Sequence, residues 1–133
     1  MPGYLLRNNK GELLVKSLEM LEIAVKAADS KRAEDIVALN MEGISLLADY
    51  FVMLTGSSER QLKAIVTAIE DAEEEKGVFV KSIEGKKGSR WILMDFGDLV
   101  INAFMSEERD LYQLEELWDQ APKVDVADWI TAE

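Results

Sequence analysis

The 133-residue chain contains no cysteine and no histidine. Without cysteine it has no disulfides, no thiolate metal sites and no cysteine nucleophile. Without histidine it lacks the commonest general base and the commonest zinc ligand. It also lacks the run of ~18 apolar residues that a membrane span needs and the apolar segment of a signal peptide. These absences remove much catalytic chemistry and indicate a cytoplasmic protein without a membrane segment.

Negative charge is abundant and unevenly distributed, with a formal net charge of −11. Residues 1–90 carry 15 acids and 13 bases, whereas residues 91–133 carry 11 acids and two bases, a net charge of −9. Such a surface repels nucleic-acid phosphates, because affinity for them comes largely from Lys and Arg. A basic protein is therefore the better expected partner. The alternative is that the acids only keep the domain in solution.

Length and composition predict one globular domain with one core. Apolar residues make up 48% of the chain and charged residues 31%, a balance typical of folded proteins. A chain of this size can bury roughly two-thirds of the surface that its unfolded form exposes. We expect the domain to span residues 1–121, with a short C-terminal tail at 122–133.

Apolar periodicity predicts three helices. The first covers residues 11–29, and its core-facing stripe consists of Leu14, Leu18, Leu21, Val25 and Ala28. A homodimer through this stripe, or through a sheet edge, stays open as an alternative to packing on a sheet. The second helix follows Ser58, which has the spacing of a capping box with Gln61, and ends at Gly77. The third covers residues 106–118, with Ser106 as its cap and Pro122 beyond its end.

Five segments are predicted as strands: 33–41, 49–56, 78–84, 89–96 and 99–105. Segment 49–56 lacks polar alternation, which is typical of a strand covered on both faces. Turns are expected at 85–88 and at Gly97-Asp98, with Asp98 bonded to the local backbone. The order helix, two strands, helix, three strands, helix predicts an α/β fold with one mixed sheet of about five strands.

Two short motifs suggest nucleotide chemistry but are incomplete. Asp95-Phe96-Gly97 is the magnesium-binding tripeptide of protein kinases, yet the glycine-rich loop, strand lysine and catalytic loop are absent. A hairpin turn explains it better. "TGSSERQ" could bind an anion at a helix start, but it lacks a Walker lysine, and the chain has no Asp-x-Asp pair for two metals. Helix capping is favoured, and a nucleotide-binding or nucleotidyltransferase-type enzyme using 56–58, Asp95 and Asp98 is the alternative.

The strand around Trp91 divides its side chains between two faces. Trp91, Leu93 and Asp95 point one way, and Ile92, Met94 and Phe96 the other. If the Trp91 face is open, it presents an aromatic anchor beside an aliphatic residue and an acid, as in an interface with a basic partner. The default for a strand tryptophan is the core. The acidic segment that follows, with Tyr112 and Trp118, favours protein recognition.

Four stretches together resemble the ribosomal silencing factor family, also called Iojap-like: "ADYFVMLTGSSERQLKAI", Glu84-Gly85, "RWILMDFGDLVINAF" and "ERDLYQLEELW". The resemblance covers residues 12–121 in consistent order. It implies a nucleotidyltransferase-like α/β fold without transferase activity, cofactor or metal. It also implies binding to the large ribosomal subunit through its protein number fourteen, with little direct nucleic-acid contact. Blocking of small-subunit joining would then lower translation when nutrients are short.

The family's characteristic residues fall in three blocks of this sequence. The first block holds Asp49, Tyr50, Gly56, Ser58, Arg60 and Gln61. The second and third blocks resemble the partner-binding portion, and from them we take as candidate binding residues Trp91, Leu93, Asp95, Asp98, Arg109, Tyr112, Glu115 and Trp118. Gly97 and Leu114 are also characteristic. Many members have histidine where this chain has Asn102, so a role that needs a titratable ring there is in doubt.

Overall fold

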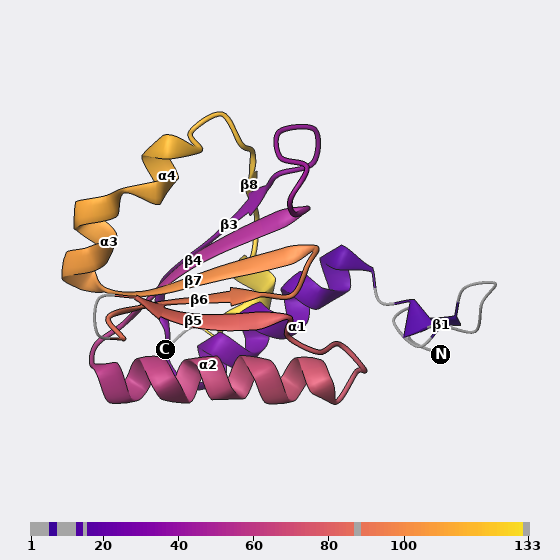
Figure 1. The fold of residues 1–133 in the computed structure, drawn as a ribbon, viewed down its shortest axis with the longest axis horizontal. Helices are drawn as coiled ribbons and strands as arrows, with labels where there is room; N and C mark the ends of the chain where they lie inside the picture. The colour runs from indigo at the N-terminus through magenta and orange to yellow at the C-terminus, as the bar shows by residue number, and fades with distance from the viewer. Residues whose placement is uncertain (1–5, 8–12, 15, 87–88, 132–133) are drawn as a thin grey trace.

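A six-stranded mixed sheet organises the molecule (Figure 1). The structure is a computed structural model that describes residues 6–7, 13–14, 16–86 and 89–131. The sheet order is β5-β6-β7-β4-β3-β8, and β4 and β7 are the parallel pair among antiparallel neighbours. The strands are β3 (Glu34–Asn40), β4 (Tyr50–Gly56), β5 (Ser82–Lys86), β6 (Trp91–Asp95), β7 (Leu99–Met105) and β8 (Lys123–Val124). This confirms the predicted α/β fold, with β8 as the strand of this sheet that the sequence did not predict.

Helices lie on both faces of this sheet (Figure 1). Helices α1 (Ser17–Ser30) and α2 (Glu59–Glu74) form a layer on one face, whereas α3 (Ser106–Tyr112) and α4 (Leu114–Leu117) lie on the other. A 3-10 turn, η2 (Ala127–Trp129), packs on α1. Strands β1 (Leu6–Arg7) and β2 (Leu13–Leu14) form a separate two-stranded sheet. In the described part of the chain, no helix is long and apolar enough to cross a bilayer.

The two faces have separate cores. The larger core lies between the sheet and the α1–α2 layer, and it includes Leu21, Leu54, Ile69 and Met94. The smaller core, on the opposite face, includes Leu39, Met41, Met53, Phe104 and Ala121, with Phe51, Trp91 and Trp118 packed against it. The predicted alternation along β6 is confirmed, since Ile92 and Met94 are buried and Trp91 and Leu93 are half-buried. The Trp91 face is therefore the less covered one.

Helix α1 begins later than predicted. Leu14 belongs to β2, where it pairs with Leu6, so it lies outside the helix. Leu18 lies in the helix but is exposed. The helix starts where the Glu19 carboxylate accepts a hydrogen bond from the Lys16 amide. The rest of the predicted stripe, Leu21, Val25 and Ala28, is buried as expected.

Helix α2 confirms the predicted cap. The Ser58 hydroxyl accepts a hydrogen bond from the Gln61 amide at 3.0 Å. The Gln61 side-chain oxygen reaches back to the Ser57 amide, and its side-chain nitrogen donates to the carbonyls of Lys31 and Arg32. Gly77 has a φ of +83°, as predicted for the end of this helix. Gln61 thereby ties the start of α2 to the end of α1.

Strand β5 and its turn differ from the prediction. The strand begins at Ser82 rather than Val78, because the Val78 amide bonds the Glu73 carbonyl at the end of α2. Gly85 pairs with Ile92 inside the ladder, so the turn lies beyond it. Residues 87–88 of the predicted turn lie outside the described residues. Gly97 does make the predicted turn with φ +92°, but the local side-chain bond comes from Asp95 rather than Asp98, with Oδ1 accepting from the Gly97 amide at 2.7 Å.

The predicted helix 106–118 is two helices. Gln113 takes a left-handed conformation with φ +47°, which ends α3 and starts α4 in a new direction. Ser106 is the first helical residue, and Met105 holds the cap position. The segment that the prediction treated as a tail returns to the fold. Its residues 123–124 pair with β3, and Val126 is buried in the larger core.

Candidate docking surface

A pocket of about 350 Å³ lies on the less covered face of the sheet. Its floor comes from β6, β7 and β4, one wall from α4, and a further side chain from the loop between β3 and β4. Mostly apolar side chains line it, with two polar residues among them: Leu47, Phe51, Trp91, Leu93, Asp95, Val100, Asn102, Leu114 and Trp118. We refer to these nine residues as the docking pocket.

Trp91 is built into the floor of the docking pocket. Its ring lies 5.1 Å from Phe104 and 4.8 Å from Tyr112, measured between ring centroids. Its indole nitrogen donates a hydrogen bond to Asn102 Oδ1 at 2.9 Å. The ring thus joins β6 to β7 and to α3. Trp91 and Tyr112 are both half-buried, so each has a structural contact and an exposed part.

The wall from α4 rests on an aromatic contact. The Trp118 ring meets Phe51 edge-on at 5.8 Å, with an interplanar angle of 82°. Leu114, at the start of α4, packs against the same smaller core. The docking pocket therefore keeps its shape only while the segment after Gln113 stays on the sheet.

Acidic groups stand at the β6–β7 end of the docking pocket. Asp95 lines it and is half-buried, whereas Asp98 is exposed in the adjoining turn. The Asp98 carbonyl accepts hydrogen bonds from the amides of Asp49 and Tyr50, which fixes the turn beside the start of β4. Burial raises the pKa of the Tyr50 hydroxyl, with Glu42 and Asp49 adding to the effect. The acids at this end favour a cationic partner.

The loop between β3 and β4 adds apolar surface that sequence analysis missed. Leu46 is fully exposed and Leu47, which lines the docking pocket, is 82% exposed. Leu117 on α4 is 66% exposed. Of these three, Leu47 lines the docking pocket, and exposed apolar side chains at a pocket are typical of interaction surfaces. The sequence shows two adjacent leucines between predicted strands, but it does not indicate whether they are buried or exposed.

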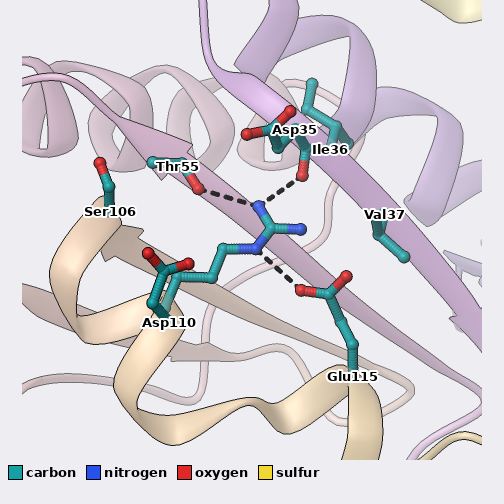
Figure 2. A pocket seen from close by; sticks show the side chains of 8 residues that line it. Asp35, Ile36, Val37, Thr55, Ser106, Asp110 and Glu115 are labelled. Atoms are coloured by element: carbon teal, nitrogen blue, oxygen red, sulfur yellow. Dashed lines mark hydrogen bonds and ion pairs between the residues drawn. The ribbon is translucent and has the colours of Figure 1, made fainter.

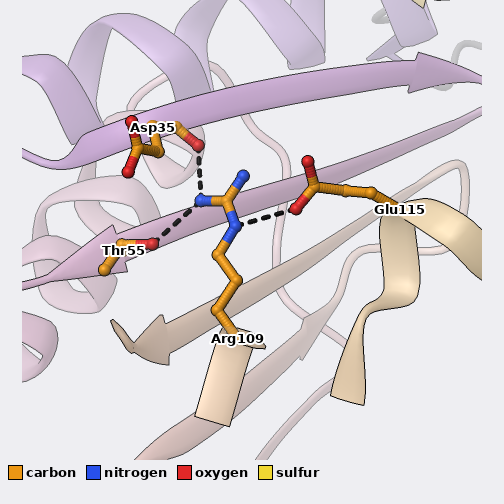
Figure 3. A network of polar contacts seen from close by, with 4 residues as sticks. All are labelled: Asp35, Thr55, Arg109 and Glu115. Carbon is orange, nitrogen blue, oxygen red and sulfur yellow. Dashed lines mark hydrogen bonds and ion pairs between the residues drawn. The ribbon is translucent and has the colours of Figure 1, made fainter. Parts of the chain in front are cut away.

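Arg109, a candidate binding residue, is not among the residues that line the docking pocket. A second pocket, of about 490 Å³, lies between α3, α4 and the ends of β3 and β4 (Figure 2), and Arg109 is one of its lining residues. There it donates to Glu115 Oε1 at 2.8 Å, to Thr55 Oγ1 at 2.9 Å and to the Asp35 carbonyl (Figure 3). Asp35 sits in a bulge of β3 with φ +49°. We call these four residues the Arg109 latch.

A second ion pair fastens the other side of α3. Arg90, just before β6, donates to Glu108 Oε2 at 2.7 Å, and Glu107 lies 3.7 Å from the same guanidinium. The hydrogen bond from Arg90 lowers the pKa of the Glu108 carboxyl. Helix α3 is thus held to the sheet through Arg90 and through the Arg109 latch.

At the start of α2, the candidate anion site, side chains of the helix start itself bind two backbone amides. Ser58 and Gln61 occupy the amides of Gln61 and Ser57, which supports the capping interpretation. Gly56 is needed there because a Cβ at this position would lie 2.9 Å from the Leu62 side chain. Among residues 16–86 and 89–131, together with the two short strands, no cluster of three or more acids could hold a metal ion.

The predicted binding residues therefore fall into two sets. The first set lines the docking pocket and consists of Trp91, Leu93, Asp95 and Trp118. Two more lie next to it: Tyr112, whose ring contacts Trp91, and Asp98, in the turn that follows β6. Arg109 and Glu115 instead pair with each other in the Arg109 latch.

Comparison with known proteins finds a family that this chain matches. The family model described as "Ribosomal silencing factor during starvation" matches residues 15–133. A ribosomal silencing factor of Bacillus subtilis is 50% identical over 107 residues, which cover 80% of this chain and 91% of that protein.

Solved structures agree with the fold. A crystal structure of a protein from Bacillus halodurans superposes with a TM-score of 0.71 at 44% identity, over 81% of this chain and 98% of the other. A crystal structure from Chromobacterium violaceum gives a TM-score of 0.76 at 30% identity, over 79% of this chain and 88% of the other.

Proposed function

Because the chain belongs to the ribosomal silencing factor family, we propose that it binds the large ribosomal subunit through ribosomal protein number fourteen and blocks joining of the small subunit. Translation would then fall when nutrients are limiting. The relatives' names describe a regulatory factor rather than an enzyme, and a blocking role requires no chemistry from the chain.

The docking pocket is the single observation that carries this proposal. It combines an apolar floor, a half-open sheet face and acids at one end. Apolar side chains of a partner would be desolvated in the pocket, and basic groups beside them would meet Asp95 and Asp98. A ribosomal protein that presents basic and apolar groups together fits this surface better than bare RNA does, because the −9 segment repels phosphates.

Blocking by occupancy needs only a stable contact. A standard interface buries roughly 800 Å² on each partner. The docking pocket, with the exposed Leu47 among its lining residues, is a surface on which such a contact can be centred. The Arg109 latch would stabilise the docking pocket indirectly, because it holds α3 and α4 on the sheet.

Sedimentation with purified subunits tests the proposal. The protein should pellet with isolated large subunits at moderate salt and remain in the supernatant with small subunits. Preincubation with large subunits should reduce the fraction of whole ribosomes formed when small subunits are added. Absence of pelleting with large subunits, or pelleting without any effect on subunit joining, would contradict it.

A further inference from the structure

Asn102 is a polar residue in an apolar setting. It lies in the middle of β7 with 2% of its surface exposed, between Ile101 and Ala103. Its partners across the sheet are Leu93 on β6 and Met53 on β4. A buried amide is costly unless it is hydrogen-bonded, so the contact that it makes should have a structural purpose.

That contact is with Trp91, and it has a defined direction. An indole N–H can only donate, so the Asn102 oxygen must face the ring and its NH₂ group must point away. The bond is 2.9 Å long. Because Trp91 also stacks between Phe104 and Tyr112, the ring is restrained by a polar contact at its nitrogen and by aromatic contacts with both neighbours. Both Asn102 and Trp91 line the docking pocket.

We propose that Asn102 is a positioning residue that fixes the Trp91 ring in the geometry the partner recognises, an inference that rests on the proposed docking function. The floor of the docking pocket is then preorganised, because the indole already has its bound orientation before the partner arrives. Preorganisation raises affinity by lowering the entropic cost of association. Trp91 acts as a rigid floor rather than as a side chain that enters the partner.

Two substitutions at Asn102 separate positioning from simple filling of space. Asn102→Leu keeps the branched shape of the side chain but removes the acceptor, whereas Asn102→Asp keeps an acceptor in the same place. Asn102→Leu should weaken binding to isolated large subunits by about tenfold, the order expected when one buried hydrogen bond is lost. Asn102→Asp should bind more tightly than Asn102→Leu.

Nuclear magnetic resonance reports directly on the Trp91 indole, and a general loss of stability would not change its signal. The indole N–H signal of Trp91, assigned by its loss in Trp91→Phe, should shift and exchange faster with solvent in Asn102→Leu. In Asn102→Asp it should stay protected. The control is Ile101→Val, at the next position of β7, where the side chain belongs to the larger core. It should lower the melting temperature without changing the indole signal or the affinity.

A double-mutant cycle completes the test. Trp91→Phe and Asn102→Leu remove the two ends of one hydrogen bond, so their combined effect on affinity should be smaller than the product of the single effects. Wild-type affinity in Asn102→Leu, an unmoved indole signal, or multiplicative effects in the cycle would overturn the positioning role. Failure of the wild-type protein to bind large subunits would instead refute the proposed function.

Discussion

Arg109 and Glu115 pair across the left-handed Gln113, with Nε and Oε1 2.8 Å apart. The pair closes the turn between α3 and α4, and the same guanidinium reaches Thr55 and Asp35 on the sheet. A single side chain therefore sets both the bend in the segment and its attachment. The docking pocket depends on this bend, because Leu114 and Trp118 form its wall.

Removal of the guanidinium should destabilise the protein. The Arg109 side chain is 10% exposed, so Arg109→Ala leaves Glu115 and the Asp35 carbonyl without this donor, at an expected cost of about 2–4 kcal/mol in the free energy of unfolding. Arg109→Lys should recover only part of the loss, since an ammonium cannot bond three acceptors in the fork geometry. Chemical denaturation measures both. As a control, Lys26→Ala breaks the exposed pair with Glu22 and should cost no more than ~0.5 kcal/mol; a similar loss in the two variants would argue against the latch.

Apolar substitutions test the docking pocket directly. Leu47→Ser and Leu93→Ser should each weaken binding to large subunits by about tenfold, because each removes aliphatic surface from the proposed contact. The expected change in melting temperature is small for Leu47, which is exposed. Leu18→Ser on α1 is the matched control, since Leu18 is also exposed but lies in the helix layer. Equal losses of binding in all three variants would place the contact elsewhere.

Charge at the pocket end should act mainly on the rate of association. Asp98→Lys places a cation where a basic partner is expected, so the association rate should fall several-fold and depend less on salt. Stopped-flow or surface-based kinetics at two ionic strengths provide the measurement. Asp71→Lys, an equal change of charge on the exposed side of α2, is the control. If both variants slow association equally, net charge rather than the acidic end of the pocket governs the rate.

Glu73 should make stability depend on pH. It is fully buried in α2, both its carboxylate oxygens are without a hydrogen-bond partner, and burial raises its pKa from 4.5 to about 8. Between pH 4.5 and 8 the folded state keeps a proton that the unfolded state releases. Its contribution to stability is therefore present below pH 4.5 and lost as the pH rises to about 8, with a slope of up to ~1.4 kcal/mol per pH unit.

Glu73→Met isolates this contribution. Denaturation of both proteins at pH 5, 6.5 and 8 should give a stability difference in favour of the variant that grows with pH, because methionine fills the site without a charge to desolvate. Glu74→Gln, at an exposed neighbouring position, should leave the pH dependence unchanged. A constant difference between Glu73→Met and wild type at the three pH values would show that Glu73 does not titrate in this range.

Sequence analysis located elements best where local signals mark both ends. Strand β7 matches its predicted bounds, because Gly97 turns the chain before it and a helix follows directly. The alternation along β6 correctly separated Trp91 from Met94. The predicted start of α1 was wrong because apolar residues such as Leu13 and Leu14 are compatible both with a helix and with a short strand. Pairing with Leu6 and Arg7 decided between the two.

The site was less predictable, since its contacts join distant parts of the chain. Arg109 reaches residues 54 and 74 positions earlier, and no local pattern indicates which bulge carbonyl it will meet. Arg109 is a candidate binding residue through the family resemblance, which does not predict its contacts within the fold. The role of Leu47 depends on how its loop lies over the sheet, which is a tertiary property.

Strand β8 and Val126 have a consequence for the order in which the protein is completed. The chain crosses from the smaller core at Ala121, around the β3 edge, to the larger core at Val126. Synthesis proceeds from the N-terminus, so this crossing is made after β3 and after the strands and helices that form the two cores. Until it emerges, β3 lacks an outer neighbour and both cores lack a residue. The nascent chain thus acquires the outer edge of its sheet only after residues 121–126 have been synthesised.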